Sequence, residues 1–186
     1  MSISLKKGGS INLTKTEPGL KKILIGLGWE LLPGSPVDLD SSVFIIGNNG
    51  KLVSESYFVF YNNLKSPDGA VQHTGDNRTG IGEGDDEVIL ANLDLINPDA
   101  VELIFLVTIH EAAQRRHNFG MLRNSYIRLF DVENKREVAR FNLDNDTPEA
   151  TEVIFGKLVK QSGEWKFLAD GSGTNFGLQG YVDIYA

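Results

Sequence analysis

The sequence contains no cysteine, only three histidines and no long apolar run. Without cysteine, the chain forms no disulfide, zinc–thiolate site or iron–sulfur cluster, and it has no cysteine nucleophile. His110 and Glu111 begin a His-Glu-x-x-His pattern, but position 114 is Gln, so the zinc-protease motif is incomplete. We therefore interpret His73, His110 and His117 as ordinary surface or capping residues.

No segment has the features of a membrane-crossing or secretory element. Residues 1–7 contain no apolar stretch of signal-peptide length. The most apolar run, residues 101–109, is too short to span a bilayer and contains Glu102. We expect a soluble, cytoplasmic protein that is not an integral membrane protein.

Positive charge is also in short supply. The formal net charge is −7, which gives no overall attraction to phosphate backbones and argues against direct nucleic-acid binding. One stretch is locally basic, and we interpret it as a solvated surface with local ion pairs rather than as a docking site for an acidic partner. Its residues are Arg115, Arg116, Arg123, Arg128, Lys135, Arg136 and Arg140.

Short stretches of alternating apolar and polar residues run through the chain and are separated by turn residues. Tyr126 and Arg128, for example, alternate with Ile127 and Leu129, as expected when successive side chains of a strand point to opposite faces. Many short strands joined by turns are typical of a β-sandwich rather than of βαβ units. We predict a mainly β fold, an antiparallel β-sandwich with a few short helices, in a single domain over residues 1–186.

Some local patterns carry separate predictions. Asn48-Asn49-Gly50 predicts a hairpin turn that leads into a strand over residues 52–61. Gly26 and Gly28 indicate a bend in a strand. Residues 62–86 are interpreted as one long loop, which is uncommon in a compact domain unless the loop is functional or disordered. Residues 111–117 suggest a short helix, and residues 170–186, rich in glycine and then mixed, receive no assignment.

Acidic residues concentrate in that long loop. Asp76, Glu83, Asp85, Asp86 and Glu87 fall within twelve positions, and Arg78 is the one basic residue among them. Two unit charges about 4 Å apart repel by about 4 kcal/mol at an effective dielectric constant near 20. Because a domain is stable by only about 5–15 kcal/mol, a compact form of this loop requires a bound cation. Ligands that are all oxygen indicate calcium, with magnesium less favoured.

A second acidic feature, Asp38-Leu39-Asp40, places two carboxylates on one face of a strand. The alternative is a polar edge or a turn in which Asp accepts backbone N–H groups. Since calcium takes about six to eight oxygens, the two acidic segments together favour a composite metal site. The spacing is not that of an EF-hand. Five carboxylates in one loop exceed the needs of a single ion, so we expect two calcium ions.

Several segments together resemble the TerD (tellurium-resistance, bacterial stress protein) family along nearly the whole chain. They are Leu5-Lys6-Lys7-Gly8, Gly26-Leu27-Gly28-Trp29, Asp38-Leu39-Asp40-Ser41-Ser42, Phe58-Val59-Phe60-Tyr61-Asn62-Asn63, Ser66-Pro67-Asp68-Gly69, His73-Thr74-Gly75-Asp76-Asn77, Gly84-Asp85-Asp86-Glu87, and Asn118-Phe119-Gly120 with Ser125-Tyr126-Ile127-Arg128. The resemblance implies a calcium-binding β-sandwich without established enzymatic activity. It also implies a role in bacterial resistance to tellurite and other stresses, in an assembly with other Ter-type stress proteins and a membrane-associated complex.

The resemblance also implies which residues bind the metal. Together with Glu83 from the acidic loop, the candidate ligands are Asp38, Asp40, Asp76, Asn77, Thr79, Gly82, Glu83, Asp85, Asp86 and Glu87. The chain departs from the family pattern at Glu30 and Glu83, where the family has Asp, and after Asp170, where the family has a Gly-rich helical ending. Glu83 is the departure that bears directly on metal geometry.

Two other functions remain open from the sequence. The acidic loop is compatible with calcium-dependent docking to an anionic membrane, in which the ion bridges carboxylates and lipid phosphates. A metal-dependent hydrolase is least favoured, because no Gly-x-Ser-x-Gly element or other evident nucleophile is present.

Overall fold

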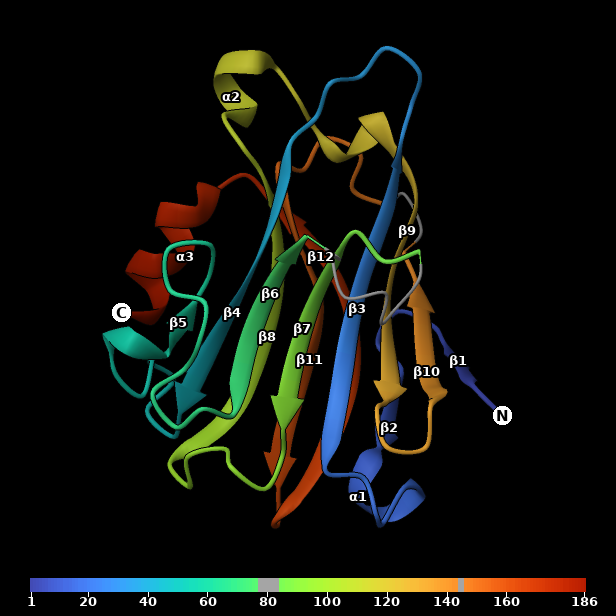
Figure 1. The fold of residues 1–186 in the computed structure, drawn as a ribbon. Coiled ribbons are helices and arrows are strands. Elements are labelled where there is room, and N and C mark those ends of the chain that lie inside the picture. Colours follow the sequence, from blue (N-terminus) through green and yellow to red (C-terminus); the bar gives the residue numbers. More distant parts are fainter. Residues whose placement is uncertain (77–83, 144–145) are drawn as a thin grey trace.

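The computed structural model describes residues 1–76, 84–143 and 146–186, which form two β-sheets packed face to face (Figure 1). Sheet A contains, in spatial order, β1 (Ile3–Leu5), β10 (Arg136–Asn142), β9 (Leu122–Asp131), β3 (Lys22–Leu31), β7 (Glu87–Asn92) and β6 (Val71–Asp76). Sheet B contains β2 (Ser10–Asn12), β12 (Glu164–Thr174), β11 (Glu152–Gln161), β8 (Ala100–Ile109), β4 (Leu39–Gly47) and β5 (Phe58–Val59). The predicted mainly β sandwich is confirmed.

Helices are few and short in the described part of the chain. They are α1 (Leu13–Thr16), α2 (Ala112–Arg115) and α3 (Gly177–Tyr185), with 3-10 turns η1 (Glu55–Tyr57) and η2 (Phe119–Met121). The short helix expected near residues 111–117 is therefore present as α2. None of the helices in the described ranges has the length and apolar character needed to cross a membrane.

The core lies between the two sheets and follows from the alternation of side chains along each strand. Ile23, Ile25 and Leu27 of β3 belong to the same buried cluster as Val43 and Ile45 of β4. Each fully buried side chain of this size stabilises the fold by about 1.5–3 kcal/mol. The sheets are antiparallel except for β1, which pairs in parallel with β10. The outer face of sheet A carries a polar network around Arg128, and α3 packs on the outer face of sheet B.

Two local predictions need correction near the edges of the sheets. The turn at residues 48–50 is present, but η1 interrupts the strand predicted over residues 52–61. Leu52 forms an isolated bridge with Ile46, and β5 is the part of this range that pairs with β4 as a strand. The predicted loop over residues 62–86 contains β6, which pairs with β7. Val71 and His73 are buried while Gln72 between them is exposed, so the alternation was present in the sequence. The alternation was not recognised in the sequence because a polar histidine, His73, occupies one of the inward positions.

The C-terminal segment is helical, contrary to the expected departure from a helical ending. β12 continues to Thr174, and α3 follows after two residues. Leu178, Tyr181, Val182 and Tyr185 lie at the i, i+3, i+4, i+7 spacing of an apolar helix face. This face packs on the outer side of sheet B against Phe44, Ile46, Ile104, Leu106 and Ile154. The glycines that precede and interrupt this pattern obscured it in the sequence.

Candidate functional site

The two acidic segments meet at one end of the sandwich, where β4 and β7 begin. Asp40 lies at the start of β4 in sheet B, and Glu87 is the first residue of β7 in sheet A. The backbone N–H of Ser41 donates to Glu87 Oε2 at 2.8 Å and links the two sheets directly. The fold therefore brings residues near position 40 and residues near position 87 together, and the composite metal site stays a prediction.

A buried polar group supports this junction. His73 is only 4% exposed, so its interpretation as a surface or capping residue is wrong. His73 Nδ1 accepts the backbone N–H of Gly75 at 3.0 Å, which places the ring proton on Nε2. His73 Nε2 lies 3.2 Å from Glu87 Oε2 and 2.9 Å from Ser41 Oγ, and the Ser41 hydroxyl also donates to Glu87. The backbone and side chain of Ser41 together with His73 thus hold Glu87 in a single orientation.

The surroundings of Asp40 disfavour its negative charge. Burial raises its pKa above 3.8, and repulsion from Glu87 and then Asp38 raises it further, against smaller opposing effects of His110 and His73. Asp38 itself is exposed, and its carbonyl accepts the N–H of His110 at 2.8 Å. Asp38 and Glu87 are therefore close enough to Asp40 for their charges to oppose its ionisation.

Asp86 directly precedes Glu87 and is exposed. Its N–H donates to the Leu27 carbonyl at 2.8 Å, and its Oδ2 accepts the N–H of Trp29 at 2.8 Å. Burial raises the pKa of Asp86, the bond from Trp29 lowers it, and the charges of Asp85 and Glu87 raise it. The net direction is upward, as at Asp40. One Asp86 oxygen is thus held by β3, and the other has no hydrogen bond from the described residues.

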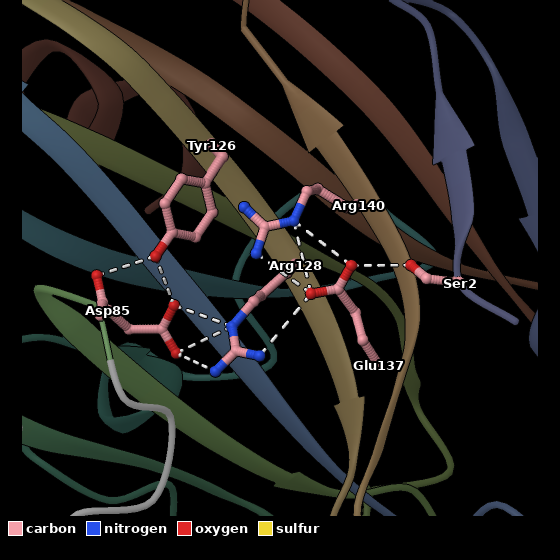
Figure 2. A network of polar contacts seen from close by, with 7 residues as sticks. Ser2, Asp85, Tyr126, Arg128, Glu137 and Arg140 are labelled. Carbon is pink, nitrogen blue, oxygen red and sulfur yellow. Dashed lines mark hydrogen bonds and ion pairs between the residues drawn. The ribbon is translucent and has the colours of Figure 1, made fainter.

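Asp85 is committed to a different set of contacts on the outer face of sheet A (Figure 2). Its side chain has no exposed area, and Arg128 donates to both carboxylate oxygens, with Nη2–Oδ2 at 2.7 Å and Nε–Oδ1 at 2.9 Å. The Tyr126 hydroxyl donates to Oδ1 at 2.7 Å and lies 2.9 Å from the Gly84 carbonyl. Bidentate pairs of this kind combine charge with fixed geometry. Asp85 therefore anchors the end of the acidic loop to β9.

The network continues to β10 and to the N-terminus. Glu137 accepts from Arg140 at 3.1 Å and from the Ser2 hydroxyl at 2.7 Å, and it lies 3.7 Å from Arg128 Nη1 (Figure 2). Burial alone would raise the pKa of Glu137, but the bonds from Arg140 and Ser2 lower it. Arg140 also lies over the Tyr126 ring at 4.2 Å. Arg128 is mostly buried, so the basic stretch is only partly the solvated surface we predicted.

Gly26 and Gly28 make this arrangement possible. A Cβ at Gly26 would overlap the Asp85 carboxylate, and a Cβ at Gly28 would overlap the Tyr126 ring. Both positions face the outer side of β3, opposite the core-facing Leu27. A register shift does follow Gly28, as a bend requires, but the main role of both glycines is close approach.

Gly26→Ala is expected to lower the free energy of unfolding by about 1–3 kcal/mol, because the new methyl group displaces Asp85 from Arg128. Chemical denaturation measures this difference. Gly19→Ala is the matched control, since nothing lies within 4 Å of a Cβ at that position and its stability should hardly change. Equal effects of the two substitutions would contradict the close-packing role of Gly26.

The remaining predicted ligands fall at or beyond the limit of the description. Asn77, Thr79, Gly82 and Glu83 lie outside the described residues, and Asp76 is placed only as the last residue of β6. Within the described ranges, no three His, Asp or Glu side chains are grouped as a metal site requires. Asp38, Asp40, Asp86 and Glu87 offer only carboxylate oxygens, a donor set that fits calcium. They would form part of a site and need further oxygen donors.

The Ser41–His73 contact does not form a nucleophile and base. A base must accept the serine proton, yet His73 Nε2 carries its own proton because Nδ1 accepts from Gly75. Ser41 is also 2% exposed. The trio of Ser41, His73 and Glu87 is thus suited to holding the sheets together rather than to hydrolysis.

A family model and similar proteins match this chain over most of its length. The family described as TerD domain matches residues 1–185. Tellurium resistance protein TerD of Serratia marcescens is 48% identical over 180 residues, which cover 96% of this chain and 94% of the relative. General stress protein 16U of Bacillus subtilis (strain 168) is 45% identical over 181 residues, with coverage of 96% and 94%.

A solved structure supports the same fold. The crystal structure of a homologue of telluride resistance protein (TerD) from Streptomyces coelicolor A3(2) matches with a TM-score of 0.66 and 24% identity. The match covers 88% of this chain and 96% of the other. At this identity the likeness concerns the fold alone, and it confirms the two-sheet architecture.

Proposed function

Because this chain belongs to the TerD family, we propose that it is a non-enzymatic calcium-binding protein of the bacterial response to tellurite and other stresses. The relatives carry tellurium-resistance and general-stress names, which support the stress role. The observation that carries the calcium proposal is the junction of Asp38, Asp40 and Glu87, where burial and then the charges of Glu87 and Asp38 raise the pKa of Asp40.

A bound calcium ion would neutralise this junction and fix the neighbouring surface for recognition by a partner. Asp38, Asp40, Asp86 and Glu87 would supply oxygens from the described residues, and Asp76, Asn77, Thr79, Gly82 and Glu83 are the proposed remaining donors. Asp85 contributes by holding the loop end against β9 through Arg128. The number of carboxylates leads us to propose two ions, each with about six to eight oxygens.

The proposed setting is an assembly with other Ter-type stress proteins. The described contacts offer structural roles for the buried Ser41 and His73 and no activated nucleophile. A surface that changes with calcium occupancy would therefore act through binding. The chain has no thiol with which to reduce or chelate tellurium.

Calorimetric titration of metal-stripped protein with calcium tests the proposal. We expect saturable binding of two ions, with clearly weaker binding of magnesium under the same conditions, because magnesium requires stricter octahedral geometry and loses water reluctantly. The measured calcium affinity would show whether the protein acts as a calcium sensor or holds calcium as a structural ion. Absence of binding heat, together with a melting temperature that neither EDTA nor excess calcium changes, would reject calcium binding.

A further inference from the structure

A groove of about 510 Å³ lies on the outer side of sheet B, between α2 and the start of α3. Figure 1 shows both helices on the same side of the sandwich. The end of sheet B forms the floor, where Asp40 of β4 pairs with Thr108 of β8 and Thr108 pairs with Glu152 of β11. Directly paired residues share one face of a sheet, so both carboxylates face the groove side.

The groove is acidic. Of its lining residues, Asp40, Glu111 and Glu152 are acidic, and none is Lys or Arg. Glu111 is paired with Arg115 at 2.8 Å. Glu152 is 1% exposed and accepts only from neutral groups among the described residues, namely Thr151, Thr174 at 2.9 Å and the Gly177 N–H at 3.0 Å. Neutral donors orient this carboxylate but leave its charge without a paired cation in the described contacts.

Two aromatic rings complete the groove. Tyr61 and Phe176 line it and are 57% and 59% exposed, although most aromatic side chains of this protein are buried or half-buried. Glu152 holds the first turn of α3, and this role explains its hydrogen bonds. It does not explain why two aromatic rings next to the acidic residues of the groove are exposed. Aromatic faces and carboxylates together attract an organic cation with an apolar stem.

We propose that this groove receives a Lys or Arg side chain of a partner protein. An anion is disfavoured by the three carboxylates, and a bare metal ion gains little from the two rings. A basic side chain uses both features, since its methylene stem contacts the rings and its charged end pairs with Asp40, while the buried Glu152 adds its negative charge from beneath the groove. The choice of a protein partner rests on the proposed assembly role, and Asp40 is shared with the proposed calcium junction.

The test is an NMR titration in EDTA, so that its outcome is independent of calcium binding. The probe is the peptide acetyl-Gly-Ala-Lys-Ala-Gly-amide, compared with the same peptide carrying norleucine in place of lysine. We expect saturable shifts at the amides of Thr108, Glu152 and Gly177 with the lysine peptide only. Replacing both rings, Tyr61→Ser with Phe176→Ser, should weaken binding at least about fivefold, as loss of cation–π contacts implies.

Matched variants separate the groove from general charge attraction. Glu152→Gln should weaken binding, whereas Glu133→Gln, which removes the same charge at an exposed turn of sheet A, should not. Leu95→Ser removes an exposed apolar side chain elsewhere and should also leave binding unchanged. Tyr61→Ser alone keeps the test valid if Glu152→Gln disturbs α3, because Tyr61 is exposed and lies outside α3.

Three outcomes would overturn the proposal. The first is shifts spread over the surface and equally reduced by Glu152→Gln and Glu133→Gln. The second is equal binding of the lysine and norleucine peptides. The third is binding of free butylammonium as tight as that of the lysine peptide, which would assign the groove to small amines instead of a protein.

Discussion

Arg128→Ala should lower the free energy of unfolding by about 3–5 kcal/mol, because it leaves a buried carboxylate without its cation. The Asp85 side chain has no exposed area, and Arg128 supplies three of its hydrogen bonds. For a domain of this size, about 2–4 °C of melting temperature corresponds to each kcal/mol, so the loss should be about 10 °C. Thermal and denaturant unfolding both measure it.

The control for this prediction is Arg123→Ala. Arg123 pairs with Glu30 at 3.2 Å, but both side chains are more than half exposed. Such pairs contribute about 0–1 kcal/mol, so the control should unfold almost like the parent protein. The double variant Asp85→Leu with Arg128→Met should recover much of the lost stability, since removing both charges removes the unpaired one. Equal losses in Arg128→Ala and Arg123→Ala would show that Asp85 does not depend on Arg128.

Asp40→Asn should affect the calcium-free and calcium-bound proteins in opposite directions. In the absence of calcium it should raise the melting temperature, because it removes a charge opposed by burial and by Glu87 and Asp38. In the parent protein, calcium at a hundredfold excess over its dissociation constant should add about 2.7 kcal/mol of stability. Asp40→Asn should remove most of that gain, because a proposed ligand oxygen is lost. Melting curves in EDTA and in calcium measure both effects.

The pH dependence of the same variant follows from the direction of the Asp40 pKa. Since the pKa in the folded protein lies above the unfolded value of 3.8, ionised Asp40 destabilises the calcium-free fold at neutral pH. This penalty diminishes as the pH falls through the raised pKa and is absent below the unfolded value. Asp40→Asn should therefore raise calcium-free stability at pH 7 more than near pH 4.

Asp94→Asn is the control for Asp40→Asn. Asp94 is exposed, lies 3.9 Å from Lys21, and follows the end of β7 opposite to the end that carries Glu87. It should change neither the calcium response nor the pH profile. A full calcium response in Asp40→Asn would remove Asp40 from the proposed ligand set, whatever the other carboxylates do.

Much of the strand arrangement was predictable, because the alternation of apolar and polar residues along a strand shows which side chains face the core. Tyr126 and Arg128 alternate with Ile127 and Leu129, and the structure places the second pair in the core and the first pair on the outer face. The alternation was misleading over residues 52–61, where η1 interrupts the predicted strand, and it was missed where a polar residue occupies an inward position. His73 faces the core junction through its bonds to Glu87 and Ser41, so its strand looked like a loop.

The acidic site was only partly predictable, because the sequence shows which carboxylates are crowded but not which are neutralised. Asp85 and Asp86 are neighbours with the same side chain. Asp85 contacts a buried arginine, and Asp86 is exposed and bonded to the backbone of Trp29. Local pattern assigns both to one metal site, whereas the fold gives them different roles.

The sequence by itself determined the β-sandwich, the lack of thiol chemistry and the need to balance a concentrated negative charge, because these depend on composition and on alternation between neighbours. Only the tertiary structure decided how that charge is distributed. Arg128 lies 43 residues from Asp85, and Ser41 lies 46 residues from Glu87. Residues so far apart in the sequence come into contact only when the sheets assemble. The register of β3, β7 and β9 then determines which carboxylate pairs with an arginine and which is left to bind another cation.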